Sequence, residues 1–412
     1  MRRSFLNAAN DPACDFPLAN LPCGVFSTGD GPRRCGVAIG DRVLDLTGAE
    51  AAGLTGTGTT FAAPSWNAHM AQGRAAWVAL RGWLTAALAE GSALEGALAP
   101  HLAPLSDVSL HMPFAVAEFT DFYAGRHHAQ NIGTMLRGAD NALPSNWDHM
   151  PIGYNGRAST VVVSGTPVRR PMGQLKPPGT DAPVLAPTRK LDFELELGAV
   201  VGTPSPMGEP VGLAQARAMI FGYVLLNDWS ARDMQAFEYQ PLGPFQAKAF
   251  ATTISPWIVT AAALAPFAVA QPEPAVPLLP HLAEPQPAAL DIELSVEVAG
   301  VTVTRANARH LSYSAAQQLV HHASSGCAMR TGDLLGSGTI SGPQPGTYGS
   351  MMELSWNGRD PVPVGDGTRT FLEDGDTVTM RGAAQRDGVH IGFGACAGTV
   401  VSPHRARADR ST

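Results

Sequence analysis

The sequence lacks an excess of positive charge, and it lacks any long hydrophobic run. Its 412 residues carry 28 lysines and arginines against 35 aspartates and glutamates, a formal net charge of −7. Proteins that hold nucleic acids by their phosphates need clustered, excess basic residues. The longest apolar stretch, residues 257–270, contains a proline and is shorter than the ~20 residues that a membrane-spanning helix needs. We therefore expect neither a nucleic acid nor a membrane as a partner.

Cysteine is scarce and irregularly spaced. The chain has five cysteines and no CxxC pair, so neither a disulfide framework nor a zinc knuckle is indicated. The first residues, which begin MRRSF, lack the apolar core of a secretory signal. The glycine motif of the P-loop is absent, and no GxGxxG leads from a strand into a helix, which disfavours a dinucleotide site. We expect a protein of the cytoplasm.

Glycine and proline, in contrast, are abundant. The 44 glycines and 34 prolines make up about a fifth of the chain, above the roughly 12% of an average protein. So much turn chemistry favours short strands and ordered loops over long helices. Because 45% of the residues are hydrophobic, the chain can still bury a substantial core. These proportions predict a β-rich protein of the α+β class.

The pattern along the chain divides it into a plain first part and a polar second part. Residues 36–46 predict a hairpin, and residues 65–105 show a helical apolar period. Seven prolines lie between residues 266 and 287, which excludes a central strand or helix there and predicts a surface excursion. After it, residues 291–305 alternate as strands do, and residues 314–326 predict a short helix.

An acidic strand is the most informative segment. In KLDFELELGAVVG, residues 190–202, a strand would place Asp192, Glu194 and Glu196 on one face. Carboxylates about 7 Å apart along one face can converge on a single cation. The alternative is a half-exposed strand whose acidic face is solvated.

A second polar cluster follows an apolar run that ends at Asp228. A carboxylate at the end of a buried strand is a plausible metal ligand. A helix is expected to start near Ser230, and Arg232 and Gln235 would share its face, where both could address an anionic substrate. Lys248 follows in the same cluster. The alternative is an ordinary amphipathic helix with salt bridges.

Two further segments supply a possible base and its partner. Asp121 and His128 lie in a dense polar run after residue 118, and a paired, oriented histidine is the usual general base. Glu353 lies in the apolar run MELSW, which we interpret as a strand, and a buried carboxylate needs a partner. We expect Glu353 to orient His128, as the third member of a catalytic triad does. Thr339 lies in a glycine-rich loop between them. A lone histidine is more often structural.

The donor types indicate the metal. Carboxylate oxygens without a cluster of cysteine or histidine favour Ca²⁺ or Mg²⁺ over zinc. The expected ligands are Asp121, Glu194, Glu196 and Asp228. Lys248 and Arg232 would balance part of their charge.

These residues stand in runs that resemble the fumarylacetoacetase family. The runs keep that family's order and spacing from about Asp15 to about Val401. They are DFPLANLPCGVFS, TDFYAGRHHAQNIG, PIGYNGRASTVVVSGTPVRRPMGQ, KLDFELELG, NDWSARDMQAFEYQPLGPF, GTISGP and SMMELSWNG.

The resemblance implies a fold and an activity. It implies an SH3-like N-terminal β domain at residues 1–115, a C-terminal mixed β-roll domain at residues 116–412, and a homodimer. The implied reaction is the metal-dependent hydrolysis of a carbon–carbon bond in fumarylacetoacetate, a 1,3-diketo acid. The products would be fumarate and acetoacetate, which is the last step of tyrosine and phenylalanine breakdown.

The resemblance also implies roles, residue by residue. It places the Ca²⁺ ligands at Asp121, Glu194, Glu196 and Asp228, the base and its orienting partner at His128 and Glu353, and stabilisers of the carbanion at Arg232, Gln235 and Lys248. Substrate contacts fall on Tyr123, Arg137, Tyr154, Tyr239 and Thr339. A second cation site, for Mg²⁺ or a monovalent ion, falls near Lys248 and Thr252, through backbone oxygen for the lysine.

One departure and two alternatives complete the sequence-based hypotheses. The family usually has GYHGR where this chain has GYNGR, with Asn155 in place of histidine. One alternative is a hydrolase, decarboxylase or hydratase of another 2,4-diketo acid. The other is a catalytically silent, metal-stabilised scaffold of the same fold. Loss of His128 or Glu353 would have indicated the scaffold, and both are present.

Overall fold

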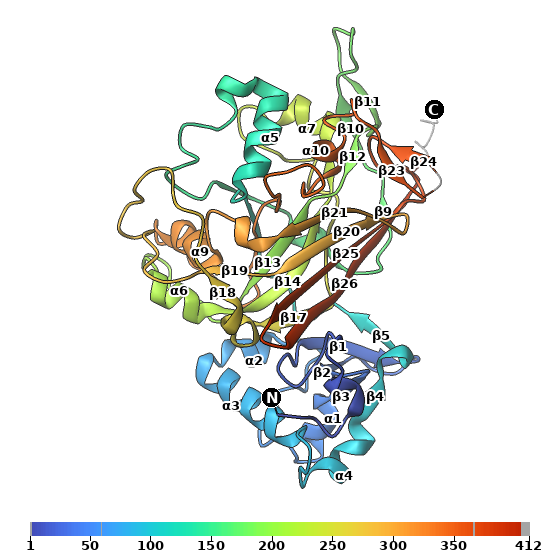
Figure 1. Ribbon diagram of the computed structural model, residues 1–412, viewed down its shortest axis with the longest axis vertical. Helices are drawn as coiled ribbons and strands as arrows, with labels where there is room; N and C mark the ends of the chain where they lie inside the picture. The colour runs from blue at the N-terminus through green and yellow to red at the C-terminus, as the bar shows by residue number, and fades with distance from the viewer. Residues whose placement is uncertain (1, 59, 366, 405–412) are drawn as a thin grey trace, which may run out of the picture.

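The computed structural model of the protein shows two regions. A smaller N-terminal region lies below a larger C-terminal region in Figure 1. The structure describes residues 2–58, 60–365 and 367–404. The outer ends of the two expected domains, residue 1 and residues 405–412, lie outside the described residues. Strands and short helices alternate throughout, and the expected β-rich α+β class is confirmed.

The N-terminal region is a small antiparallel sheet with helices beside it. The hairpin expected at residues 36–46 is confirmed, because its two strands pair from Gly36↔Asp45 to Ile39↔Arg42. Its tight turn uses Gly40 with φ +59°, a conformation that favours glycine. The strands are β1 (Cys23–Thr28), β2 (Arg34–Ile39), β3 (Arg42–Asp45), β4 (Leu102–Pro104) and β5 (Val108–His111), and the helices are α1 (Leu46–Ala51), α2 (Asn67–Ala71), α3 (Arg74–Ala87) and α4 (Glu95–Leu98).

One large sheet joins the two regions. Its order is β4-β3-β2-β1-β17-β14-β13-β22-β6-β7, with β5, β8 and β16 attached off this path. β1 of the N-terminal region pairs with β17 at Cys23↔Ile258. The further strands are β6 (Phe119–Phe122), β7 (Gly153–Asn155), β8 (Val161–Val163), β13 (Leu195–Val201), β14 (Ile220–Asp228), β16 (Thr252–Ile254), β17 (Trp257–Thr260) and β22 (Leu334–Gly336).

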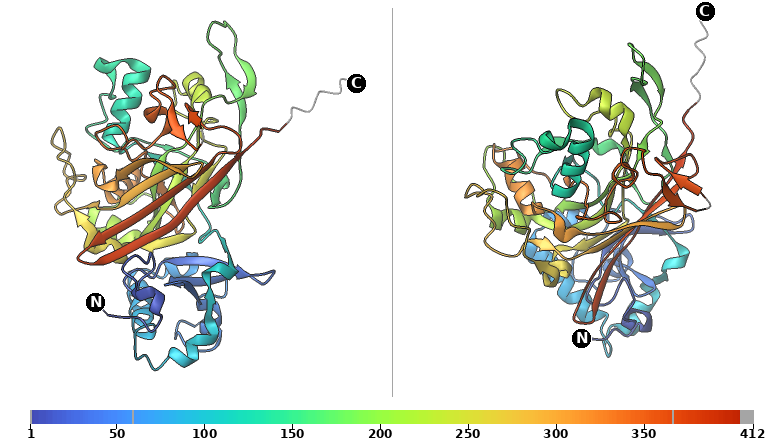
Figure 2. Two further views of the ribbon diagram at one scale, coloured as in Figure 1. Left: turned by 45° about the vertical axis from the view of Figure 1, so that its right-hand side comes forward. Right: turned by 45° about the horizontal axis from the view of Figure 1, so that its top comes forward.

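A second sheet packs against the large one. Its order is β21-β20-β25-β26-β9, and its two long strands, β25 and β26, run diagonally across the molecule (Figures 1 and 2). Leu225 of the large sheet packs in one core cluster with Leu294 and Phe393 of the second. The strands are β9 (Val168–Arg169), β20 (Glu293–Val298), β21 (Val301–Asn307), β25 (Thr377–Arg386) and β26 (Val389–Val401).

The remaining elements are short. They are α5 (Arg126–Arg137), α6 (Leu213–Met219), α7 (Arg232–Glu238), α8 (Ala261–Leu264), α9 (Ala315–Ala323), α10 (Met351–Leu354), β10 (Met172–Leu175), β11 (Val184–Pro187), β12 (Leu191–Asp192), β15 (Ser230–Ala231), β18 (Ala268–Val269), β19 (Ala289–Leu290), β23 (Val362–Val364) and β24 (Gly367–Arg369). β10 and β11 form a hairpin that projects from the top of the molecule (Figure 2).

The proline-rich segment is an ordered excursion, as the sequence predicts. β18 and β19 pair at its two ends and close it into a loop. Near its end Leu282 is buried, and its carbonyl accepts a hydrogen bond of 2.7 Å from Gln317 Nε2. Helix α9, which carries Gln317, begins at the capping box of Ser314. The helix expected at residues 314–326 is thereby confirmed.

Two expectations about local structure are wrong. Glu353 lies in the short helix α10 and not in a strand, because the Ser350 hydroxyl caps the helix at the Glu353 N–H. Residues 190–202 do not form one continuous strand, since β12 ends at Asp192 and β13 begins at Leu195. Both faces of β13 are buried, so the half-exposed alternative is wrong as well.

Candidate active site and metal centre

Four buried carboxylates converge at one end of the large sheet. Asp121 lies on β6, Glu194 directly before β13, Glu196 on β13 and Asp228 at the end of β14. These segments are neighbours, because β14 pairs with β13 and β22 joins β13 to β6. One oxygen from each side chain lies within 4.8 Å of the corresponding oxygens of the others. The structure therefore brings all four expected ligands together.

A glycine makes this convergence sterically feasible. Gly336 on β22 pairs with Asp121 on one side and with Gly198 on the other. A Cβ atom at this position would lie 2.6 Å from Asp121 Oδ1 and 3.0 Å from Glu196 Oε2. Any side chain here would push the two carboxylates apart.

Two cations offset part of the negative charge. Lys248 Nζ donates to Asp228 Oδ2 at 2.8 Å and also binds Glu194. Arg232 Nη1 lies 2.7 Å from Glu194 Oε1. Burial alone would raise the pKa of Glu194, but Lys248 and Arg232 hold that pKa below its ordinary value. Glu194 is therefore an ionised member of the cluster.

The other carboxylates remain undercompensated. Burial, followed by the charges of neighbouring carboxylates, raises the pKa of Asp121 and of Glu196 well above ordinary values. Asp121 Oδ1 and Glu196 Oε1 are buried and have no hydrogen-bond partner among the described residues. Buried carboxylate oxygens need a proton or a cation, and an all-oxygen donor set suits a hard divalent ion. The residues present therefore fit a divalent metal.

His128 and Glu353 form a buried pair beside the cluster. His128, on helix α5, has its Nδ1 atom 2.7 Å from Glu353 Oε2. Its other nitrogen, Nε2, lies 3.7 Å from Glu194 Oε1. Burial alone would raise the pKa of Glu353, but His128 and the surrounding hydrogen bonds lower it. The expected pairing of base and partner is present.

Three polar side chains around Glu353 were missed by the sequence analysis. Asn131 Nδ2 donates to Glu353 Oε1 at 2.9 Å. The hydroxyls of Ser341 and Ser350 each donate to Oε2 at 2.9 Å. Asn131 could have been found from the sequence, because it lies three residues after His128 and shares its helix face. Ser350 could also have been found, because a serine three residues before a glutamate is a signature of a helix start. Ser341 lies in a loop that carries no such signal.

Further expected residues surround His128 and the cations. The Tyr123 ring meets the His128 ring edge-on, with centroids 5.6 Å apart. Arg232 Nη1 donates to Gln235 Oε1 at 3.0 Å, which confirms their shared helix face. The Thr339 hydroxyl and Arg232 Nη2 are buried without hydrogen-bond partners among the described residues. Unpaired buried groups of this kind fit a site that completes its contacts with a ligand.

Glycine again allows a close approach next to His128. Gly125 is the N-cap of helix α5. A Cβ atom there would lie 2.1 Å from the Thr339 carbonyl oxygen. The glycine therefore lets the loop that carries Thr339 reach the start of the helix that carries His128.

Two more expected residues contact Asp228, one of the expected metal ligands, directly. The Tyr154 hydroxyl donates to Asp228 Oδ2 at 3.2 Å, and the Thr252 hydroxyl donates to Oδ1 at 3.3 Å. Asn155, the departure from the usual motif, is exposed on β7 and pairs with Thr120 in the strand register. Its side chain is therefore remote from the buried contacts that its neighbour makes.

Two expected substrate contacts make their hydrogen bonds elsewhere. Arg137, at the end of α5, donates through Nε to the Asn141 carbonyl at 3.1 Å. The Tyr239 hydroxyl accepts a hydrogen bond of 3.2 Å from the side chain of Gln240. Both side chains are only half-buried.

Asp192 does not join the carboxylate cluster, although the alternation of the sequence places it with Glu194 and Glu196. Its carboxylate accepts a hydrogen bond of 2.8 Å from Arg232 Nε. The same carboxylate accepts from the N–H groups of Met351 and Met352 at 2.7 and 3.0 Å. Asp192 therefore ties Arg232 to the helix that carries Glu353.

A buried carboxylate cluster beside a histidine–glutamate pair, carried on a mixed sheet, defines a metal-dependent enzyme. Two family models match the chain: "Fumarylacetoacetase N-terminal" over residues 19–113 and "Fumarylacetoacetate (FAA) hydrolase C-terminal" over residues 118–401. The chain belongs to the fumarylacetoacetase family.

Curated relatives match over almost the whole length. Fumarylacetoacetase from Bos taurus is 48% identical and that from Homo sapiens 47%, each over 97% of this chain and 98% of the relative. The protein of that name from Arabidopsis thaliana is 44% identical over 97% of this chain and 98% of its own length. No helix in the described part of the chain has the length and apolar character needed to cross a membrane.

Solved structures share the fold at low sequence identity. A fumarylacetoacetate hydrolase from Exiguobacterium antarcticum is 18% identical with a TM-score of 0.55, covering 93% of this chain and 99% of that one. A maleylpyruvate hydrolase from Sphingobium in complex with manganese and pyruvate is 21% identical with a TM-score of 0.51, covering 93% and 100%.

Asp192→Asn tests the link between Arg232 and helix α10. The amide keeps the size of the carboxylate but removes its charge, so Arg232 and the helix lose their shared anchor. Because small misplacements of catalytic groups are costly, we expect kcat to fall about 10²-fold with a smaller change in KM. Asp233→Asn, next to Arg232 on helix α7, is the control, since Asp233 binds Thr188 and the Arg189 N–H instead. Equal kinetic losses in both variants would contradict the positioning role.

The raised pKa of Glu196 predicts an unusual pH dependence of the chelated protein. A carboxyl group whose pKa rises on folding stabilises the fold below its unfolded pKa, and this stability is lost as the pH rises through the folded pKa. We expect the thermal midpoint in EDTA to fall as the pH rises above the ordinary pKa of a glutamate, and to fall less in Glu196→Gln. Exposed Glu209→Gln is the control. Parallel curves for Glu196→Gln and wild type would contradict this assignment.

Proposed function

We propose that this chain hydrolyses the carbon–carbon bond of fumarylacetoacetate to give fumarate and acetoacetate. The observation that carries the proposal is the His128–Glu353 pair at 2.7 Å beside four convergent carboxylates. It occurs in a chain that is 42–48% identical to curated fumarylacetoacetases over most of its length. The site combines a general base, a cation site and buried positive charge, and the proposed reaction requires all three.

His128 acts as the general base. With Nδ1–H donated to Glu353, the lone pair of Nε2 is left to accept a proton from water. The Nε2 atom lies 3.7 Å from Glu194 Oε1, too far for a hydrogen bond to occupy it. Glu353, held ionised, stabilises the imidazolium that forms.

The water oxygen adds to the ketone next to the fumaryl double bond, and the adjacent carbon–carbon bond then breaks. Its electron pair leaves as the enolate of acetoacetate, which is then protonated. When bound, a divalent cation supplies positive charge that polarises the diketone. Lys248, Arg232 and Gln235 stabilise the departing enolate, and the unpaired Arg232 Nη2 is the donor left to reach it.

Three further residues are proposed as substrate contacts. Tyr123 lies against His128, Tyr154 contacts Asp228, and Thr339 lies beside the start of the helix that carries His128. Within the described ranges, the Tyr239 hydroxyl only accepts its present hydrogen bond, and Arg137 donates only through Nε and Nη2. We propose that the Tyr239 O–H and Arg137 Nη1 are the donors left to hold a substrate carboxylate.

The metal proposal has two parts. We propose Ca²⁺ or Mg²⁺ at Asp121, Glu194, Glu196 and Asp228, because all donors are hard oxygens. We also propose a second cation site near Lys248 and Thr252. The Lys248 ammonium itself binds two carboxylates, so only its backbone oxygen is left for such an ion.

The setting of the enzyme is also a proposal. The matched ranges 19–113 and 118–401 support the division into domains at 1–115 and 116–412. The five cysteines are free, which supports a reducing compartment such as the cytoplasm. A homodimer and a place in tyrosine and phenylalanine breakdown follow from the proposed reaction and family.

The first test is the loss of the diketone absorbance of fumarylacetoacetate. We expect rapid loss with the purified protein, no loss after EDTA treatment, and recovery when Ca²⁺ or Mg²⁺ is added. Recovery by a divalent ion would establish substrate, reaction and cofactor together. No loss with any metal would refute the proposed substrate, and turnover of simpler acylpyruvates alone would assign the chain to another diketo acid.

Substitution of His128 tests the mechanism. We expect His128→Ala to lower kcat by about 10²–10⁴-fold, the usual contribution of a general base. Glu353→Gln should lower kcat less, because an amide still accepts from Nδ1–H but does not stabilise the imidazolium. His127→Ala is the matched control, since His127 precedes His128 on α5 and its ring contacts His310 instead. Turnover of His128→Ala within a few-fold of wild type would disprove the base.

A further inference from the structure

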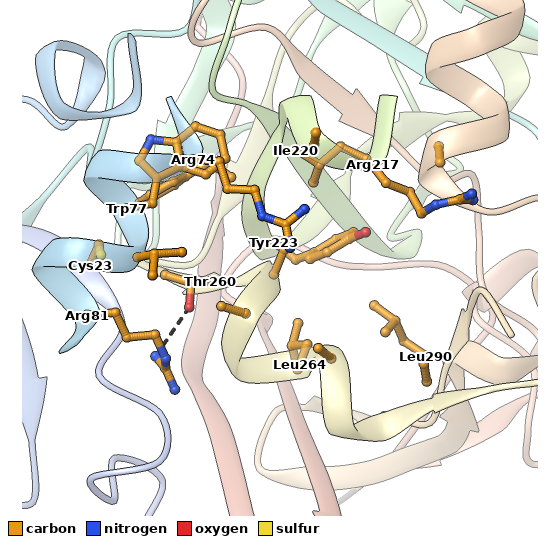
Figure 3. Close-up of a pocket in the computed structure, with 18 of the residues that line it drawn as sticks. Cys23, Arg74, Trp77, Arg81, Arg217, Ile220, Tyr223, Thr260, Leu264 and Leu290 are labelled. Atoms are coloured by element: carbon orange, nitrogen blue, oxygen red, sulfur yellow. Dashed lines mark hydrogen bonds between the residues drawn. The ribbon is translucent and has the colours of Figure 1, made fainter. Parts of the chain in front are cut away.

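A large cavity lies at the junction of the N-terminal and C-terminal regions. It has a volume of about 820 Å³ and lies where helix α3 of the N-terminal region meets α6, β14 and α8 of the C-terminal region (Figure 3). The end of the proline-rich loop closes one side at Gln286 and Pro287. Among the described residues, none of the carboxylates, cations or hydrogen-bonding groups assigned to the active site lines it.

The charge of this cavity is opposite to that of the chain. Three arginines, Arg74, Arg81 and Arg217, line it, and no aspartate or glutamate among the described residues does. The chain as a whole carries a net charge of −7. A concave site lined by one sign of charge focuses its field on a ligand of the opposite sign.

Only part of this positive charge is neutralised by the protein. Arg81 donates to the carbonyls of Ala19 and Asn20, so its role is structural. Arg217 forms an ion pair with Glu284 through a single nitrogen. The Arg74 side chain is exposed, and it makes no hydrogen bond or ion pair with any residue that the structure describes. Its guanidinium extends toward Tyr223 in the cavity (Figure 3).

The walls are otherwise uncharged and mainly apolar. Their apolar residues include Trp77 and Leu80 of α3 and Ile220, Leu264 and Leu290 of the C-terminal region. A volume of about 820 Å³ is within the range of about 300–1,000 Å³ typical of small-molecule sites. Such sites combine mainly apolar walls with a few convergent polar groups, and they occur preferentially between domains.

A buried histidine adds one more unpaired polar group. His69 lines the cavity, is 2% exposed, and its Nδ1 has no hydrogen-bond partner among the described residues. Burial lowers the pKa of His69 to about 4, so near neutral pH it is an uncharged donor or acceptor. It can therefore take part in ligand recognition without adding charge.

We propose that this cavity binds a small organic acid with an aromatic or branched apolar body. The carboxylate lies against the Arg74 guanidinium, in the field of Arg217, and the apolar body lies between Trp77 and Leu264. This site is separate from the proposed catalytic centre and does not depend on the proposed reaction. Because its walls come from both regions, a bound ligand stabilises their junction.

The probe for this site is 1-naphthoate, with 1-naphthalenemethanol as its uncharged counterpart. Calorimetry with the full-length protein and its divalent cation should show saturable binding of one naphthoate per chain and weaker binding of the alcohol. Naphthoate should also raise the thermal midpoint. No saturable binding up to about 10 mM naphthoate, or equal affinity for the alcohol, would overturn the proposal.

Variants locate the binding. Arg74→Gln should raise the dissociation constant about fivefold or more, and Arg217→Gln should raise it less, because a charge-assisted contact is worth more than a distant field. Ala218→Trp should abolish binding by filling the cavity, while the thermal midpoint shows whether it still folds. Exposed Arg33→Gln is the control. Unchanged naphthoate affinity in Arg74→Gln, or in folded Ala218→Trp, would overturn the assignment of this cavity.

Discussion

The mutual repulsion of four buried carboxylates is the constraint on which the site depends. Charges of one sign do not gather in a protein interior unless opposite charge meets them. Lys248 and Arg232 provide two positive charges, and both contact Glu194. Asp121 and Glu196 have no such compensation among the described residues, so burial and the neighbouring carboxylates raise their pKa values and favour their protonated forms. A divalent cation would supply the positive charge that the protein's own side chains do not provide.

The same charges also organise the catalytic groups. Arg232 binds Glu194 of the cluster and Asp192, which in turn holds the N–H groups at the start of helix α10. That helix carries Glu353, and Glu353 orients His128. His128 is therefore linked to the carboxylate cluster through Glu353, helix α10, Asp192 and Arg232.

The N-terminal region reaches the C-terminal region through the pairing of β1 with β17, and helix α3 forms part of the junction. The arginine-lined cavity lies beside helix α3 and shares strand β14 with the proposed active site, since Tyr223 lines the cavity and Asp228 ends the strand. Although the chain has a net negative charge, three of its arginines gather at this cavity and four of its buried carboxylates gather at the acidic cluster. The acidic site suits a cation and the basic site suits an anion, so the two recognise different ligands.

The sequence by itself determined the local features and the chemical types. The hairpin at residues 36–46, helix α9 and the interruption by prolines follow from spacing and turn residues, which act within a few positions. The donors Asp121, Glu194, Glu196 and Asp228 were predicted partly from their residue type and partly from resemblance. Only the tertiary structure decided that Asp192 leaves the cluster. A two-residue period assumes an unbroken strand, whereas the side chain of Asp192 is held by Arg232 and by helix α10, which are far away in the chain. The helix at Glu353, in contrast, has a local origin, because the Ser350 hydroxyl caps the Glu353 N–H three residues further on. The arginine-lined cavity, like the position of Asp192, was decided by the tertiary structure, since Arg74 and Arg217 meet only when α3 and α6 pack around one space.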